Sequence, residues 1–396
     1  MKYKKLGQNL YEYGFMILAV KNLLDSSGLF KRPEWFDTLL IFTFVCLIFW
    51  KLALQRYTMS RLLIFGVVGV ICAYTCIKGN YFYIIFSFLG IIAMQDVDLK
   101  EVVRKTSNVK IIIMLIHVLV YFIMLLVMPD KIVYIYRNGI KRHYFFLGHP
   151  NTFSMYVLWT SMEYLYSRYD KLKIINLTSI WFVNFIAYQF TNSNTGVMVT
   201  TLAIFLSICD KKNVKRIIKA LQPISKYGFA ICSITIPLFV ASYSKFSGRM
   251  MDIFNQINDF FTGRLLYGAY VYDVYGATLL GRTITFPRKS YWRGHWIDTI
   301  VLDNSYIWLF VMYGALYLIV LSIAFYLIAK STSNIEKILI ISFTFYGVME
   351  AYIMNAAICF PLLFIGKYLY LRIQEKSIFK LKHEWNYREE KYECQD

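Results

Sequence analysis

Long apolar runs alternate with short polar segments over almost the whole chain. A helix that crosses a bilayer at right angles needs about 20 mostly apolar residues, so runs near this length predict membrane spans. The first run lacks a small-residue cleavage site and many runs follow it, which favours an uncleaved span over a signal peptide. The pattern predicts twelve spans, at about residues 9–26, 36–54, 61–77, 80–95, 110–129, 149–167, 172–190, 195–209, 228–243, 302–329, 336–353 and 355–371.

The composition agrees with lipid as the main solvent of the chain. Hydrophobic residues make up 58% and aromatic residues 18%, and the mean hydropathy is +0.48. The formal net charge of +19 lies in short loops between the spans, which argues against a nucleic-acid-binding module. The seven cysteines lie mostly inside apolar runs and form no C-x-x-C pair, so we expect neither a disulfide framework nor a metal site.

The positive charges predict the orientation of the spans. Loops on alternate sides hold 27 and 14 Lys and Arg residues, and the richer side is cytoplasmic. This arrangement places both termini inside. It divides the chain into nine spans with a basic outside loop at 130–148 (1–243), a large extracytoplasmic loop (244–301), three further spans (302–371) and a cytoplasmic tail (372–396).

Two outside loops are themselves basic. One covers 130–148, and the other, 244–301, runs into the polar stretch "GRTITFPRKSYWRGHWIDTIVLDNSY" at 281–306. Positive charge outside runs against the insertion bias, so we interpret these loops as phosphate-binding. Attraction to anionic lipid headgroups is the alternative interpretation.

The large loop also carries a helical pattern. Over 246–265, apolar residues recur at helical spacing opposite Asp and Asn residues. This pattern predicts a helix lying in the membrane interface, or a helix packed on the loop's own core. Both arrangements deliver Arg264 to the membrane surface.

Several short motifs then follow in a fixed order. They are "GHPN" at 148–151, "TNSNTG" at 191–196, "FTGRLLYGAY" from 261, "YGATLLGRTITF" from 275, and the pair Asp303-Asn304 before "SYIWLFVMYGALYLI". This order resembles the O-antigen polymerase and ligase superfamily of Wzy-type membrane glycosyltransferases. Arg137 and Gly148 match that family's Arg, ten residues, Gly spacing, whereas Arg264 and Gly276 are one residue too far apart.

The resemblance implies chemistry on lipid-linked sugars. It implies an all-α, GT-C-like integral membrane fold in the bacterial cytoplasmic membrane, with the active-site loop extracytoplasmic. The donor would be a glycan on undecaprenyl diphosphate, the acceptor another lipid-linked repeat unit, and the reaction an inverting displacement without metal or other cofactor. A chain-length regulator and a flippase are the partners that the family implies, and the sequence leaves open whether the enzyme works alone.

A diphosphate leaving group needs cations that stabilise its developing charge, for which forked guanidinium groups are suited. The candidates are Arg137, Arg142, Arg264, Arg282 and Arg293. The alternative for each is a loop-stabilising ion pair or a lipid headgroup contact.

The acceptor hydroxyl needs a base, for which Asp303 and His295 are the two candidates. Asp303 has the alternative role of a helix N-cap. Trp292 and Trp296, beside His295, are candidates for stacking on a sugar or for the interfacial aromatic belt. Asn304 is a further candidate for substrate contact.

Two more polar residues lie at or inside predicted spans. Glu350 is an intramembrane carboxylate and therefore a functional candidate, although a contact that holds helices together, with Tyr352 or Asn355, is the favoured interpretation. His149 precedes Pro150 and is assigned either to phosphate contact or to the start of the sixth span.

Three functions compete. A repeat-unit polymerase is favoured over a ligase of the same superfamily because Asp303 stands where ligases carry His. A flippase of lipid-linked oligosaccharide would concentrate charge inside the spans, whereas this chain carries its polar residues on a large outside loop. The sequence contains no Walker, H-E-x-x-H or G-x-S-x-G motif that would indicate another enzyme.

Overall fold

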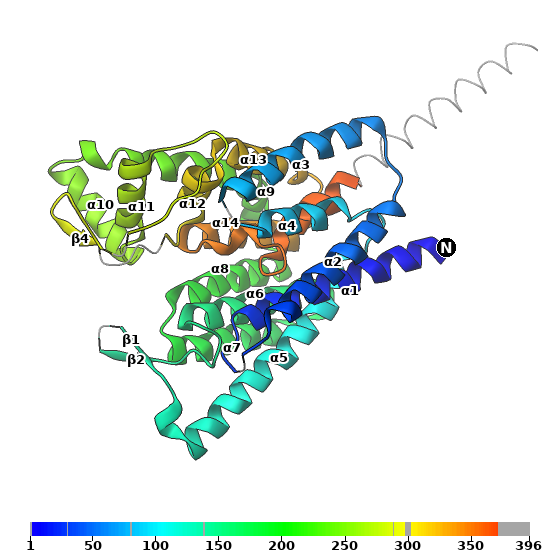
Figure 1. Cartoon of the computed structure of the whole chain (residues 1–396), viewed down its shortest axis with the longest axis horizontal. Coiled ribbons are helices and arrows are strands. Elements are labelled where there is room, and N and C mark those ends of the chain that lie inside the picture. Colours follow the sequence, from blue (N-terminus) through cyan, green and yellow to red (C-terminus); the bar gives the residue numbers. More distant parts are fainter. Residues whose placement is uncertain are drawn as a thin grey trace, which may run out of the picture.

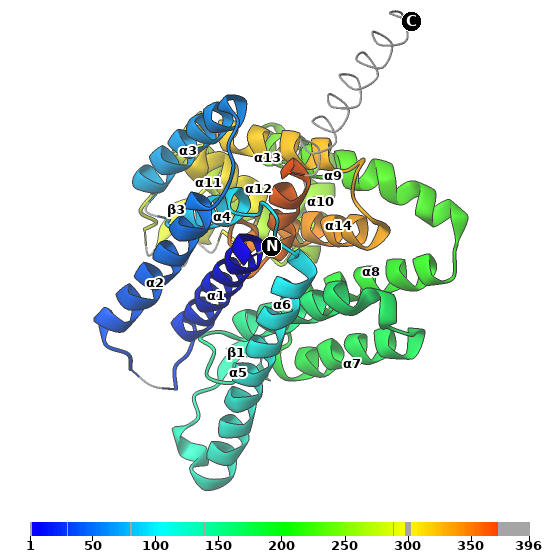
Figure 2. The ribbon, with the colours of Figure 1, turned by 90° about the vertical axis from the view of Figure 1, so that its right-hand side faces the viewer.

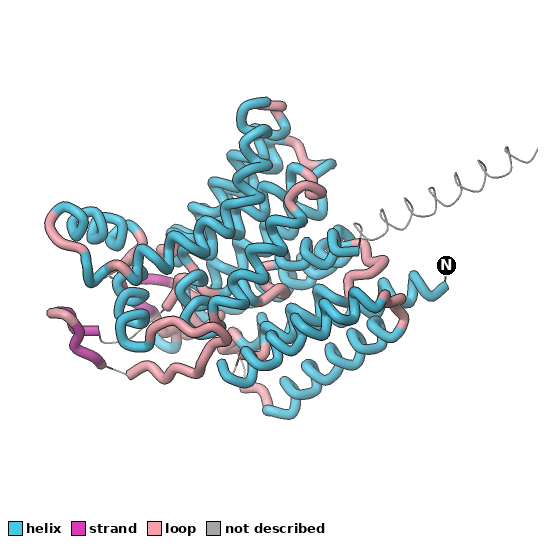
Figure 3. Tube along the Cα trace, turned by 90° about the horizontal axis from the view of Figure 1, so that it is seen from above, coloured by secondary structure: helices cyan, strands magenta, loops and turns pink. Residues whose placement is uncertain are grey.

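The computed structural model describes residues 2–29, 31–79, 81–137, 139–287, 289–297 and 302–370. The fold is all-helical, with two small hairpins (Figure 3). Within these described ranges, four helices are long and apolar enough to cross a membrane: Glu34–Ala53, Met59–Gly79, Leu99–Val127 and Lys215–Ala241. The chain is therefore an all-α protein of membrane-embedded type.

The helices follow one another with short connections as far as α9, except between α5 and α6, where the first basic loop lies. In the first half they are α1 (Lys2–Asp25), α2 (Glu34–Ala53), α3 (Met59–Gly79), α4 (Tyr83–Ile92), α5 (Leu99–Val127), α6 (Pro150–Arg168), α7 (Ile174–Thr191) and α8 (Asn194–Lys211). In the second half they are α9 (Lys215–Ala241), α10 (Arg249–Phe260), α11 (Arg264–Tyr275), α12 (Ser305–Trp308), α13 (Ala315–Ile328) and α14 (Asn334–Met349).

Each of the two basic loops contains one antiparallel hairpin. Strands β1 (Ile135–Arg137) and β2 (Ile140–Arg142) lie in the first loop, and β3 (Ser290–Trp292) and β4 (His295–Ile297) in the second. Figure 1 shows both hairpins, together with α10 and α11, at one end of the molecule, with the N-terminus at the opposite end. Both basic loops thus lie at the same end of the helical bundle.

The lateral surface of the bundle is apolar. Viewed from the N-terminal end (Figure 2), α2 and α3 lie on one side and α7 and α8 on the other, with α1 and α6 between them. Large side chains on the outer helices are exposed, among them Phe42, Ile64, Leu119 and Phe182. These exposed side chains form an apolar belt around the bundle. Such a belt would promote aggregation in water but suits a lipid environment.

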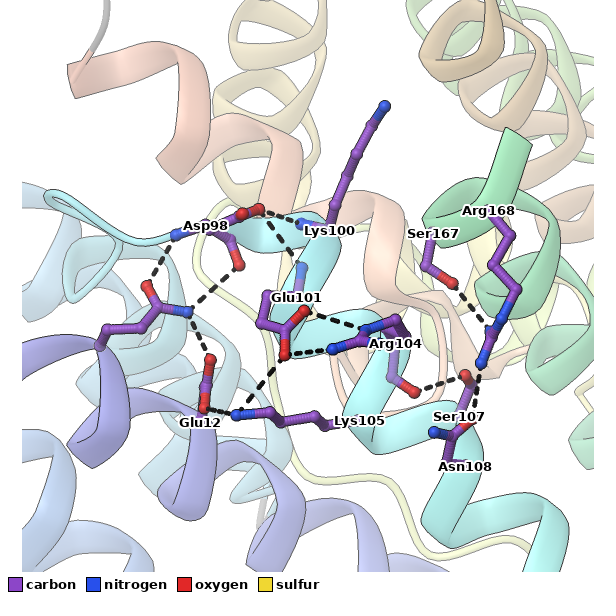
Figure 4. A network of polar contacts seen from close by, with 11 residues as sticks. Glu12, Asp98, Lys100, Glu101, Arg104, Lys105, Ser107, Asn108, Ser167 and Arg168 are labelled. Atoms are coloured by element: carbon purple, nitrogen blue, oxygen red, sulfur yellow. Dashed lines mark hydrogen bonds and ion pairs between the residues drawn. The ribbon is translucent and has the colours of Figure 1, made fainter. Parts of the chain in front are cut away.

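A polar network lies at the end opposite the hairpins (Figure 4). Glu12 of α1 accepts from Lys105 of α5, and Arg104 forms a forked pair with Glu101. Lys100 to Lys110 were predicted to connect two spans. Instead, Asp98 caps α5 through the backbone N–H groups of Lys100 and Glu101, so these charges occupy the first three turns of a longer helix.

The predicted tenth span, 302–329, is interrupted in its middle. Helix α12 passes into a π-helical stretch at Leu309–Tyr313, and α13 begins at Ala315. Gly314 has φ +94°, and a Cβ there would lie 2.4 Å from the Leu279 carbonyl oxygen. Two backbone bonds dock the loop on this break, from Ala315 N to Thr278 O at 2.8 Å and from Leu316 N to Leu279 O at 3.1 Å. Only glycine permits this close approach.

The predicted last two spans also differ from the structure. Helix α14 ends at Met349, and 350–362 contains short 3₁₀ turns before helical structure resumes at 363–370. Polar side chains of other helices satisfy this irregular backbone: the Ser87 hydroxyl donates to Met354 O (2.7 Å), and Lys110 Nζ donates to Ala357 O (2.6 Å). Lys110 is itself paired with Glu163 at 2.5 Å, and both are buried. Non-helical backbone at membrane depth requires such internal partners.

Candidate functional site

Arg264 is positioned by the turn between α10 and α11. Gly263 adopts φ +85°, and its N–H donates to Asn258 O (2.8 Å), while Asn258 Oδ1 accepts from the Leu266 N–H (2.9 Å). The Thr-Gly-Arg element is therefore a turn that starts α11 with Arg264 as its first residue. The helix predicted within 246–265 is confirmed, although in the structure it covers only Arg249–Phe260.

Arg264 lies between two carboxylates. Its Nη2 donates to Glu350 Oε1 at 3.0 Å and approaches Asp303 Oδ2 at 3.5 Å. The side chains of Arg264 and Glu350 are buried, whereas that of Asp303 is 24% exposed. Glu350 also accepts from the Thr195 hydroxyl at 2.9 Å. Glu350 thus anchors the guanidinium group, and Asp303 is the carboxylate that remains accessible.

Asn304, rather than Asp303, caps the helix that follows. Its Oδ1 accepts from the N–H groups of Tyr306 (3.0 Å) and Ile307 (3.2 Å), and its Nδ2 donates to Val348 O (2.8 Å). The capping alternative for Asp303 is therefore wrong. The predicted substrate contact of Asn304 is also wrong, because the side chain is fully buried and both of its polar atoms are engaged.

Arg142 is held by both motifs of the first half of the chain. Its Nε donates to Thr191 O (2.6 Å) and its Nη2 to Asn151 Oδ1 (2.6 Å). The first acceptor begins "TNSNTG" and the second ends "GHPN". Burial lowers the pKa of Arg142, with Arg137 acting in the same direction and Glu350 in the opposite one. Arg142 therefore lies within electrostatic range of the carboxylate that anchors Arg264.

His149 lies beside these arginines at the start of α6. Its Nδ1 accepts from the Asn151 N–H (3.2 Å), which leaves the ring proton on Nε2. Burial, followed by Arg142 and Arg137, lowers the pKa of His149. The imidazole is accordingly neutral, and Nε2–H is its available donor.

Asp303 lines a cavity of about 410 Å³. Aromatic side chains form much of its wall, and the other polar side chains come from three separate segments of the chain, 22–26, 303 and 355. Its lining includes Asn22, Asp25, Tyr81, Trp308, Tyr313 and Asn355. Burial raises the pKa of the Asp303 carboxyl above its ordinary value, while Arg264 acts in the opposite direction.

An apolar groove of about 620 Å³ runs along α5, α6 and α7. Its lining includes Val118 of α5, Val157 of α6 and Val183 of α7. Phe145 and Phe190 line it as well, and they pack around His143, the residue that follows Arg142. The groove thus extends from the basic hairpin into the apolar belt.

Two further predicted arginines, Arg282 and Arg293, have partners within the large loop. Arg282 Nη2 donates to the carbonyl groups of Gly276 (3.3 Å) and Ala277 (3.1 Å). Arg293 pairs with Asp273 at 3.1 Å. Trp292 donates to the same carboxylate (2.8 Å), and this bond is the main cause of the lowered pKa of Asp273. These contacts stabilise the loop and agree with the loop-stabilising alternative for Arg282, Arg293 and Trp292, whose predicted contacts with a substrate stay predictions.

The two tryptophans differ in exposure. Trp292 is buried, stacked on Tyr243 at 5.3 Å between ring centroids, so its predicted face for a sugar is covered. Trp296 is 71% exposed and remains available to a ligand or an interface. The side chain of His295 lies outside the described residues, so its predicted role as a base stays a prediction.

Sequence reasoning undervalued three residues. Glu350 was weighed mainly as a helix contact, although its place inside an apolar run was the available signal. Thr195, whose hydroxyl donates to Glu350, lies in the motif "TNSNTG", which contributes to the family resemblance without assigning a role to this residue. Asn22 gave no signal, because a lone Asn in the first apolar run resembles many structural amides.

No protein-family profile, curated protein or solved structure matches this chain. Its class is accordingly defined by fold and site: an all-helical membrane protein with a cation–carboxylate cluster and an aromatic cavity at one end.

Proposed function

We propose that this chain is a membrane glycosyltransferase that polymerises undecaprenyl-diphosphate-linked repeat units into a surface polysaccharide, such as a capsule, exopolysaccharide or O-antigen. It would act at the outer face of the bacterial cytoplasmic membrane, with twelve membrane passages and both termini inside. The observation that carries the proposal is the cluster in which accessible Asp303 lines a cavity beside buried Arg264.

The cluster supplies the two groups that the reaction needs. The acceptor hydroxyl oxygen attacks the anomeric carbon while the carbon–oxygen bond to the diphosphate breaks. Asp303 accepts the hydroxyl proton, and the leaving diphosphate takes the bonding electron pair with inversion at carbon. Asp303 fits the role of base because it is the exposed carboxylate of the pair.

Arg264 and Arg142 fit the role of diphosphate ligands. In Arg264 only Nη2 contacts the two carboxylates, and a guanidinium group has five N–H donors, so others remain for phosphate oxygens. Arg142 adds a second fixed cation within range of Glu350. Guanidinium groups held in place before the reaction stabilise developing charge without reorganisation.

The apolar groove supports a lipid-linked substrate. Its lining is almost wholly apolar, and two of its members, Phe145 and Phe190, contact His143 next to Arg142. A prenyl chain in this groove would place its diphosphate beside Arg142. The lipid would thereby enter from the side of the bundle.

The test uses purified full-length protein in detergent with synthetic lipid-diphosphate repeat units. Wild type should give a polymer ladder on a gel, while Asp303→Asn and the double variant Arg264→Ala/Glu350→Gln, which leaves no unpaired buried carboxylate, should give none although they remain folded. Arg249→Ala, an exposed arginine of the same loop, is the matched control and should keep the ladder. A single transfer to a different acceptor, without a ladder, would indicate the ligase.

A second candidate is a flippase of lipid-linked oligosaccharide. The irregular segment 350–362 and the buried Lys110–Glu163 pair favour it, because broken helices and buried charges are common in transporters. Movement of the lipid-linked unit across liposome bilayers, with no ladder, would support this candidate and overturn the polymerase.

A further inference from the structure

The cavity that holds Asp303 has a second polar region, formed by Asn22 of α1 and Asn355 of the irregular segment. We propose that this region is a sugar-recognition subsite that forms hydrogen bonds with a hydroxyl group of the acceptor sugar. The assignment of an acceptor rests on the proposed function. The recognition of a sugar rests on the geometry of the subsite.

The orientation of the two amides is fixed by one backbone group. The Ala357 N–H can only donate, and it donates to Asn355 Oδ1 at 3.1 Å. That oxygen therefore also accepts from Asn22, which must present Nδ2, at 3.1 Å. As a result, Asn22 Oδ1 is the atom left over.

The remaining oxygen is a buried acceptor that no described residue satisfies. Asn22 is only 3% exposed and lines the cavity. Among the described residues, Asn355 Nδ2 donates no hydrogen bond, so it remains available as a donor. An acceptor and a donor on two amides that contact each other and line one cavity match a sugar hydroxyl, which donates and accepts at once. A buried polar group without a partner costs free energy, so a ligand that satisfies it gains selectivity.

The surrounding walls fit a pyranose ring. Tyr81 packs edge-on against Trp308 (5.3 Å) and Tyr313 (5.4 Å), which forms an aromatic wall for the apolar face of a sugar. Asp25 adds a carboxylate on the polar side, and its charge is balanced by Lys21 (2.5 Å) and Arg32 (3.3 Å). A neutralised carboxylate can accept from a further hydroxyl without repelling the diphosphate.

The position of Asp303 identifies which sugar binds here. Asp303 lines the same cavity, so a ring held by the two amides lies within the space that the base faces. The base takes its proton from the acceptor hydroxyl. The subsite therefore selects the acceptor sugar, and Asn22 and Asn355 are specificity-determining residues that take no proton.

The test measures binding of free sugars in the absence of turnover. Full-length protein in detergent is titrated with methyl glucopyranoside, galactopyranoside and 2-acetamido-2-deoxyglucopyranoside and their monodeoxy analogues, by saturation-transfer difference NMR. Wild type should discriminate about tenfold between one pyranoside and one of its deoxy analogues. Asn22→Leu should bind both equally, with the affinity of the weaker one.

Two controls keep the test decisive. Asn184→Leu removes another buried amide, on α7 away from the cavity, and should leave the discrimination intact. Asn22→Ser, a smaller change, should reduce the discrimination if Asn22→Leu does not fold. No binding of any pyranoside to wild type, or equal loss in Asn184→Leu, would overturn the subsite. Binding without a polymer ladder would overturn the proposed function and leave the subsite standing.

Discussion

Arg264 is bonded to two carboxylates whose surroundings differ. Glu350 is buried and holds both Arg264 and Thr195, whereas Asp303 faces the cavity. Removal of one partner from a buried ion pair leaves an uncompensated charge and is strongly destabilising. The two carboxylates are therefore expected to respond differently to substitution, in stability as well as in activity.

Arg264→Ala should destabilise the protein by about 3–5 kcal/mol, because it leaves Glu350 buried and unpaired. The thermal midpoint in detergent measures this effect. The double variant Arg264→Ala/Glu350→Gln should recover much of the midpoint and none of the polymerase activity. An unchanged midpoint in Arg264→Ala would contradict the buried pair.

Asp303→Asn should abolish polymerisation without lowering the thermal midpoint at neutral pH. Burial raises the pKa of Asp303 in the folded protein, so its folded state favours the protonated form. The contribution of the protonated carboxyl to the free energy of unfolding is present below the pKa of Asp303 in the unfolded chain. It is lost as pH rises through the higher pKa of Asp303 in the folded protein. At neutral pH the ionised carboxylate is thus a net cost, which Asn removes. A large drop in the midpoint would show that Asp303 holds the fold together.

The same raised pKa predicts the acid limb of activity. A base must be ionised, so kcat/KM should fall as pH decreases through the pKa of Asp303, at a higher pH than for an ordinary carboxyl. The measurement is initial rate against pH between about 4 and 8, with midpoints checked for folding. A limb at the ordinary carboxyl value would contradict the raised pKa of Asp303. A limb near the ordinary imidazole value of about 6.5 that persists in Asp303→Asn would assign the proton transfer to another group, with His295 as the next residue to substitute.

How far the site could be predicted from sequence differs by residue. Motifs on one face of the predicted topology led to the prediction of three site residues, Asp303, Arg264 and Arg142. Glu350 could be recognised only as an unusual charge, because its partner lies 86 positions away in the sequence. Hydrogen-bond satisfaction, which separates Asn22 from other amides, is a tertiary property and has no sequence pattern.

At the scale of elements, the break at Gly314 connects the large loop to the bundle. Gly314→Ala should lower the thermal midpoint, since a left-handed conformation costs about 1–2 kcal/mol for a residue with Cβ and the added atom meets Leu279 O at 2.4 Å. Gly66→Ala in α3 is the matched control, because open space surrounds that position. An equal midpoint for both variants would contradict the docking of the loop on this break.

The groove along α5, α6 and α7 gives a second prediction at this scale. Val183→Trp and Ile186→Trp should raise KM for substrates with a long prenyl chain about tenfold, and should leave KM for short-chain analogues unchanged. Phe182→Trp is the control on the same helix, because Phe182 is exposed but does not line the groove. Equal effects on both chain lengths would assign the groove a structural role.

Hydropathy predicted the bounds of a helix well where contact with lipid alone determines which side chains are apolar. Helices α2 and α3 coincide closely with predicted spans because their outer faces are apolar throughout. It failed at α4, which has only ten residues, and at 350–362. There, backbone partners such as Ser87 and Lys110 replace helical bonds, and these partners come from distant parts of the chain.

The whole molecule has a polar network at one end and both hairpins at the other (Figures 1 and 4). This polarity agrees with the charge bias of the loops, in which the side richer in Lys and Arg faces the cytoplasm. The reaction requires the cluster of Arg264 and Asp303 to face the opposite side. Orientation is therefore the property of the whole molecule on which the proposed function depends.

Single cysteines in a background without native cysteines test this orientation. A membrane-impermeant maleimide added to intact cells should label Lys131→Cys and Asp259→Cys, which are exposed in the two basic loops, and should not label Lys212→Cys between α8 and α9. Lysis should make Lys212→Cys reactive, which controls for its accessibility. Labelling of Lys212→Cys alone in intact cells would show that the orientation is opposite to the proposed one. The cluster would then face the cytoplasm, where polymerisation on the outer face is impossible.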